Sequence, residues 1–140
     1  MFRWSRLAFG GLVLLWVGVA AAGLIAQSRG GNPVAAKVKN PAAVTAASIK
    51  TGEQLFQKNC QFCHGATGLG DGKLAPKDMK PANLTDATWD RGDTDGEIHA
   101  IVLGGIPEAK MPGVKGRVSD MDAWHIVNYV RSLGPKAATR

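Results

Sequence analysis

The feature that most constrains this chain is one pentapeptide, Cys60-Gln61-Phe62-Cys63-His64. Its C-x-x-C-H spacing is the attachment signature of a c-type haem. Positions i and i+3 of a helical turn face the same side, so both thiols can reach the vinyl groups of one porphyrin. His64 follows directly and is placed to bind the iron as the proximal ligand. The pentapeptide therefore predicts one covalently bound haem c.

Other interpretations of the two cysteines are weaker. A structural zinc site needs about four ligands, and Cys60 and Cys63 are the only cysteines in the chain. A thioredoxin-like pair belongs beside a βαβ pattern, and no strand pattern flanks this segment. A plain structural disulfide remains open as an alternative.

The net positive charge of the chain comes from its first fifty residues. The formal net charge is +6, and residues 1–50 carry all of it because they contain six basic and no acidic side chains. Residues 51–140 hold equal numbers of basic and acidic side chains. A neutral globular part offers no phosphate-binding stripe, so the composition argues against a nucleic-acid partner.

Leu7–Ala26 is a run of twenty residues without a charged side chain. As a helix it would reach about 30 Å, the thickness of a bilayer core. The alternative is a cleaved signal peptide, whose apolar region usually spans about 7–15 residues. Cleavage after Ala26 would place Leu24 at the −3 position, a poor match to the usual small residue. We therefore predict an uncleaved membrane anchor over residues 1–28.

Two further segments follow the anchor. Residues 29–47 are rich in Ala, Gly, Pro and Lys without an apolar period, which predicts a flexible linker. Residues 48–136 form the predicted domain. Its helices are expected from Ser48 as N-cap to about Asn59, from a Thr94 capping box to Gly104, and from Ser119 to Leu133. Between the first two helices lies a long irregular loop, which is uncommon unless it is functional.

With these segments in place, Ile49–Leu133 resembles a class I, monohaem c-type cytochrome domain. The pentapeptide carries most of the resemblance, and several flanking segments look like the bacterial branch: G-D-G (70–72), P-A-N-L-T-D (81–86), T-D-G-E-I (94–98), G-G-I-P (104–107), M-P (111–112) and W-H-I-V-N-Y-V-R-S-L (124–133). That branch includes membrane-anchored carriers and the cytochrome subunits of oxidases and dehydrogenases. The resemblance implies an all-α cytochrome c fold of about three main helices around one haem, with an N-terminal transmembrane helix added here. It also implies that Gly52 and Phe56 face the last helix near Tyr129.

The resemblance implies a set of ligands and neighbours for the haem. His64 and Met111 would be the axial ligands of the iron, a pair that raises its reduction potential. The carbonyl of Pro76 would accept the proximal imidazole N–H, with Pro81 as a rival, and Trp124 would pack near the haem or act as a core aromatic. The other candidate ligands are weaker: Met79, Met121, His99 and His125. We expect the two histidines to be structural or exposed.

Three functions compete at this point. The first is one-electron transfer between membrane-associated redox partners by an anchored carrier. The second is a permanent haem subunit of a membrane dehydrogenase or terminal oxidase. The third, an enzyme or gas sensor, would need an open iron, which two protein ligands exclude. Because C-x-x-C-H cytochromes receive their haem outside the cytoplasm, the domain is expected on the periplasmic side of the inner membrane.

Overall fold

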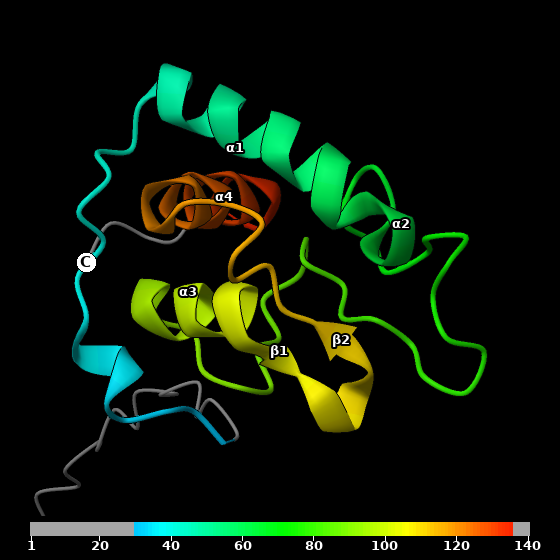
Figure 1. Cartoon of the computed structure of the whole chain (residues 1–140). Helices are drawn as coiled ribbons and strands as arrows, with labels where there is room; N and C mark the ends of the chain where they lie inside the picture. Colours follow the sequence, from blue (N-terminus) through cyan, green and yellow to red (C-terminus); the bar gives the residue numbers. More distant parts are fainter. Residues whose placement is uncertain (1–29, 136–140) are drawn as a thin grey trace, which may run out of the picture.

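The computed structural model describes residues 30–135, and its helices gather around the C-terminal one. The main helices are α1 (Ala46–Asn59), α3 (Asp95–Gly104) and α4 (Asp120–Leu133), and a short α2 (Gln61–His64) follows α1. Two 3-10 turns, η1 (Ala35–Lys37) and η2 (Pro107–Ala109), and one antiparallel hairpin, β1 (Gly105–Ile106) with β2 (Met111–Pro112), complete the fold. α4 lies between α1 and α3 (Figure 1). The expected arrangement of three main helices is confirmed.

Two helices begin at the predicted caps. The Thr94 side chain accepts a hydrogen bond from the Glu97 backbone N–H, and the Glu97 carboxylate accepts one from Thr94, which completes a capping box. Ser119 and Asp122 form the same reciprocal pair at the start of α4. These bonds satisfy backbone donors that the first turn of a helix leaves free.

The start of α1 differs from the prediction. Thr45, not Ser48, is the N-cap, and its side chain accepts from the Ser48 backbone N–H. The Ser48 hydroxyl is buried instead, 2.8 Å from His125 Nδ1 and 2.8 Å from the Asn128 amide nitrogen, which donates to it. Ser48 serves the contact between α1 and α4 because buried polar groups need partners.

α1 and α4 cross at Gly52. A β-carbon at this position would lie 1.9 Å from the His125 carbonyl oxygen and 2.8 Å from Tyr129 Cβ, so only glycine fits. One turn later the Phe56 ring meets the Tyr129 ring at a centroid distance of 5.2 Å. The contact expected between Gly52, Phe56 and the last helix is confirmed. It joins the core of the domain, where Phe56 is fully buried.

Gly52→Ala is expected to destabilise the domain by about 2 kcal/mol or more, because the added methyl overlaps backbone atoms of α4 that cannot rotate away. Gly104→Ala is the matched control, since no atom lies within 4 Å of a β-carbon there and alanine favours a helix by up to about 1 kcal/mol. Chemical denaturation of the two holoproteins measures the difference. Equal stability of both variants would contradict the close crossing.

Residues 31–45, which we call the strap, differ from the flexible linker expected over residues 29–47. Ala35 is buried against α3, and a β-carbon at Gly96 would lie 2.1 Å from the Ala35 carbonyl oxygen. Further along, the Asn40 side-chain amide donates to the Asn128 side chain of α4 at 2.8 Å. The composition predicted mobility, but the strap packs because Gly96 of α3 lets its backbone approach closely and Asn40 bonds to α4.

Asn128 is the buried residue that fastens the strap. Its amide nitrogen lies 3.2 Å from the Ala42 carbonyl oxygen and 2.8 Å from the Ser48 hydroxyl, and its side chain is almost fully buried. Asn128→Ala is expected to cost about 1–3 kcal/mol by leaving buried polar groups unpaired. Amide hydrogen exchange should accelerate over residues 32–43 while the Leu84 N–H, bonded to Gly68, stays protected as the internal control. Unchanged exchange in the strap would contradict this role.

The predicted membrane anchor, residues 1–28 with its apolar run Leu7–Ala26, lies outside the described residues. Among residues 30–135, no helix is both long enough and apolar enough to cross a bilayer.

Candidate functional site

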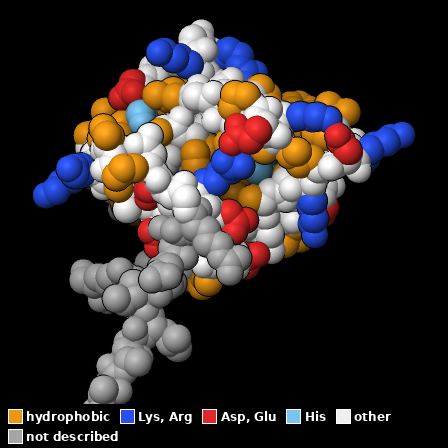
Figure 2. Space-filling model, turned by 90° about the horizontal axis from the view of Figure 1, so that it is seen from below, with side chains coloured by type: hydrophobic (Ala, Val, Ile, Leu, Met, Phe, Trp, Pro, Cys, Tyr) orange, Lys and Arg blue, Asp and Glu red, His pale blue; other side chains and the backbone are white. Residues whose placement is uncertain are grey.

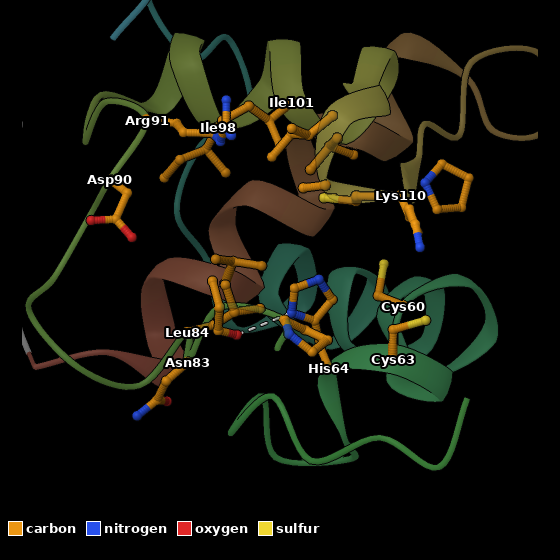
Figure 3. Close-up of a pocket in the computed structure, with 18 of the residues that line it drawn as sticks. Cys60, Cys63, His64, Asn83, Leu84, Asp90, Arg91, Ile98, Ile101 and Lys110 are labelled. Atoms are coloured by element: carbon orange, nitrogen blue, oxygen red, sulfur yellow. Dashed lines mark hydrogen bonds between the residues drawn. The ribbon is translucent and has the colours of Figure 1, made fainter. Parts of the chain in front are cut away.

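A cavity of about 300 Å³ opens between α2, α3, the β1–β2 hairpin and the loop that follows residue 75. Figure 3 shows Cys60, Cys63 and His64 on one side of it and Ile98 and Ile101 of α3 on the opposite side. Figure 2 shows hydrophobic side chains recessed among charged ones on the face that it presents. A mostly apolar cavity of this size with a few polar groups is typical of a cofactor site.

Both predicted attachment thiols line this cavity. Cys60 is the junction between α1 and α2, since its backbone N–H donates to the Phe56 carbonyl at 2.8 Å and its own carbonyl accepts from His64 at 3.0 Å. Burial raises the pKa of the Cys60 thiol to about 11, which keeps it protonated at neutral pH. Cys60 and Cys63 are free thiols here, not a disulfide.

His64 ends α2 with its ring held in place. The side chain is 8% exposed, and Nδ1 lies 3.2 Å from the Ala82 carbonyl oxygen, to which it can donate a proton. That bond leaves Nε2 for a metal and sets the ring orientation. Burial lowers the pKa of His64, and the bond to Ala82 opposes it. Burial therefore favours the neutral imidazole, which is the form that binds a metal.

The acceptor for His64 corrects a prediction. Pro76 lines the cavity as expected, and so does its rival Pro81, but the carbonyl that meets the imidazole belongs to Ala82. Ala82 lies 18 residues after His64 along the chain. No sequence signal could have identified it, because every residue carries a backbone carbonyl and only the loop path selects one.

The glycine-rich segment after His64 wraps the chain around α2. The Gly70 N–H donates to the His64 carbonyl at 2.8 Å, and the Gly72 N–H donates to the Cys63 carbonyl at 3.0 Å. The Leu74 N–H donates to the Phe62 carbonyl at 2.8 Å. A β-carbon at Gly72 would lie 2.4 Å from the Phe62 carbonyl oxygen. The absence of a side chain at Gly72 lets the loop close over α2, and this packing fixes the direction of the two thiols and the imidazole.

Met111 and Met79 both line the cavity. Met111 lies in β2, where it pairs with Ile106 of β1, so its backbone has a defined register. Two exposed ion pairs join residues shortly before Met111 to the loop that precedes α3: Lys110 with Asp78 at 2.5 Å and Glu108 with Arg91 at 2.6 Å. Met79 lies in the irregular loop.

Four other predicted candidates do not line the cavity. Trp124 is buried but does not line the cavity, so the core alternative holds for it. Its ring stacks on His99 at a centroid distance of 3.8 Å. His125 bonds to Ser48, which agrees with a structural role, and Met121 is 46% exposed at the start of α4.

Sequence reasoning missed most of the apolar lining of the cavity. Three residues of α3 line the cavity although their helix begins more than thirty residues after His64, and the loop and α4 add others: Ile98, Ile101, Val102, Leu84, Trp89, Ile126 and Val130. The sequence predicts the α3 helix. Which residues face α3 across the cavity depends on how α3 packs on α4. Trp89 is itself held under the Arg131 guanidinium, 5.3 Å from its ring centre.

These residues fit a covalent haem: two thiols, a neutral imidazole with its free nitrogen available, a thioether sulfur donor and an apolar wall share one cavity. The fold and the site together define a c-type cytochrome domain. The chain belongs to the family described as cytochrome C oxidase, cbb3-type, subunit III, whose model matches residues 47–130.

Curated relatives and solved structures agree with this family. The chain is 35% identical over 101 residues to the cbb3-type cytochrome c oxidase subunit CcoP of Rubrivivax gelatinosus, covering 72% of the chain and 29% of the relative. It is 33% identical over 87 residues to subunit FixP of Rhizobium meliloti (strain 1021), covering 61% and 28%. The chain thus spans less than a third of the length of these relatives.

Two solved structures share the fold. Cytochrome cL of Methylophaga aminisulfidivorans matches with a TM-score of 0.53 and 27% identity, covering 64% of this chain and 57% of that one. A chain of the Kuenenia stuttgartiensis reducing HAO-like protein complex matches with a TM-score of 0.62 at 24% identity, covering 71% and 49%.

Proposed function

We propose that this chain transfers single electrons through one haem c as a fixed subunit of a membrane-bound terminal oxidase complex. The observation that carries the proposal is the C-x-x-C-H segment on the wall of an apolar cavity, within a stretch that matches an oxidase subunit family. The chain has two cysteines and so can attach one haem in this way. The haem supplies an iron that accepts and releases one electron.

The protein's part is to hold and enclose the haem. Cys60 and Cys63 would hold the haem through two thioethers, and His64 through Nε2 and Met111 through its sulfur would be the ligands of its iron. The Ala82 carbonyl keeps the imidazole in one tautomer. Two protein ligands would leave no open position on the iron for oxygen or substrate, which favours electron transfer over catalysis at this haem. Met111 is preferred to Met79 because the hairpin gives it a defined backbone position.

The fixed-subunit hypothesis is favoured over the free membrane carrier by the comparisons, since the relatives quoted above are named as oxidase subunits. Leu7–Ala26 would anchor the chain in the inner membrane, with the haem domain on the periplasmic side. Its partners would be the other redox subunits of the complex. Because the chain spans less than a third of each relative's length, these partners are proposals.

Mild detergent extraction of native membranes followed by size exclusion tests the assembly. A fixed subunit should elute with other redox proteins, at a mass far above the 14.7 kDa of the chain. The haem absorbance should follow the same peak. A haem-containing species that elutes alone in its micelle would support the free carrier instead.

A further inference from the structure

We infer that two exposed ion pairs position Met111, because they fasten the hairpin that carries it to the loop beside the cavity. The segments concerned are the Met111 hairpin (residues 105–112) and the cavity loop (residues 76–92), and both line the cavity. The inference rests on the proposed haem function and goes beyond it, since it assigns the residues that keep the second ligand on the iron. The positioning residues form two pairs, one residue of each pair from either segment: Lys110 with Asp78, and Glu108 with Arg91.

Toward α3, the Met111 hairpin is held by backbone contacts. The hairpin follows α3 directly, and the chain beyond it returns to the same helix, because the Val114 N–H donates to the Val102 carbonyl at 2.9 Å. A β-carbon at Gly113 would lie 2.1 Å from the Leu103 carbonyl oxygen, so the two backbones approach closely. This side of the hairpin therefore belongs to the packed fold.

Toward the cavity loop, the polar links of the hairpin are the two ion pairs. Lys110 Nζ lies 2.5 Å from Asp78 Oδ2, and Arg91 Nη1 lies 2.6 Å from Glu108 Oε1. Among residues 30–135, no other hydrogen bond or ion pair joins the hairpin to this loop. The loop contains no helix or strand that could hold the hairpin through a backbone ladder. Charge therefore has a larger share in holding this side of the hairpin than the other.

The conformation of Lys110 supports a role for its side chain. Its backbone is left-handed, with φ 52° and ψ 23°, which residues other than glycine adopt rarely. Glycines aside, it is the only residue with a positive φ in the part of the chain that the structure describes. A glycine would fit this backbone with less strain, so the lysine contributes its ammonium group directly before Met111.

The two pairs act at separate points. Figure 3 shows Arg91 and Lys110 well apart along the cavity. A single pair would leave the hairpin free to turn about it, whereas two separated pairs set both its distance from the loop and its tilt. A metal ligand must be held to within about 0.5 Å of its productive position, so a small tilt is enough to move the Met111 sulfur away. Because exposed ion pairs are weak, their loss should show in local opening of the hairpin and not in whether the domain folds.

The test measures how easily imidazole replaces Met111 in the purified ferric holoprotein. Loss of the long-wavelength methionine band reports the replacement, at about pH 8, where imidazole is mostly neutral and both carboxylates are charged. The double variant Asp78→Asn, Glu108→Gln removes both negative charges, and neither side chain lines the cavity. The affinity for imidazole should rise by about threefold to tenfold. Potassium chloride at about 0.5 M should raise the affinity of the unaltered protein and leave that of the double variant unchanged.

Two variants serve as controls. Glu53→Gln removes an exposed carboxylate that pairs with Lys50 at 2.9 Å on α1, away from the hairpin, and should leave the imidazole affinity unchanged. Asn128→Ala weakens the packing of the strap and should also leave it unchanged. This second control separates the positioning of Met111 from a general loss of stability.

Each outcome decides one point. Equal imidazole affinity in the double variant and the unaltered protein at low salt would overturn the positioning role, while the haem spectrum would still support electron transfer. A rise of the same size in either control would also overturn it, and an unaltered protein that does not respond to salt would overturn its ionic basis. A ferric protein without the methionine band would overturn Met111 as a ligand, and this inference with it, but not the covalent haem at Cys60 and Cys63.

Discussion

Replacing Cys60 and Cys63 together by serine is expected to abolish covalently bound haem. A hydroxyl cannot form the thioether that each thiol forms with a vinyl group. Cys60 and Cys63 are the only cysteines in the chain, so the double variant has no thiol left. Haem staining after denaturing electrophoresis, together with the mass of the intact chain, measures the loss. Expression must include a haem attachment system, so that the unaltered chain is loaded.

The single variants Cys60→Ser and Cys63→Ser are the controls for this result, since each keeps one thiol on the cavity wall. They should retain haem through one thioether, at reduced yield. Haem that stays bound to the double variant after denaturation would show that another residue forms the covalent link, and would remove the chemical basis of the site.

Met111→Ala is expected to open the iron. The ferric protein should lose the weak long-wavelength absorption band that marks methionine ligation. The reduced protein should bind carbon monoxide at neutral pH, and the reduction potential should fall because a methionine ligand raises it. Optical spectra and a redox titration of the purified holoprotein measure all three changes.

Two methionine variants serve as controls for Met111→Ala. Met79→Ala also removes a thioether from the cavity wall and should leave the band in place, whereas Met121 lies exposed on α4 and its replacement should change nothing. A band that persists in Met111→Ala and disappears in Met79→Ala would identify Met79 as the ligand. Carbon monoxide binding by the unaltered reduced protein would favour the open-site enzyme or gas sensor.

The parts of the fold that the sequence predicted correctly depend on neighbouring residues. Thr94 and Ser119 cap their helices with side chains three residues away, so the signal is local. Gly52 was detectable as an unfavourable residue inside a helix pattern, and the structure supplies its reason in the crossing of α1 and α4. Ser48 was misplaced as a cap because its true partners, His125 and Asn128, are distant in sequence.

The prediction of Cys60, Cys63 and His64 as haem-binding residues needed no structure, because thioether formation and iron ligation need residue types at short, regular spacing. Three features became clear only from the packed fold: the carbonyl that bonds to His64, the apolar side chains that line the cavity, and the packing of the strap on the domain. Those outcomes depend on contacts between segments far apart in the chain, such as Ala82 with His64 and Asn40 with Asn128, whose energy exists only after α1, α3 and α4 have packed.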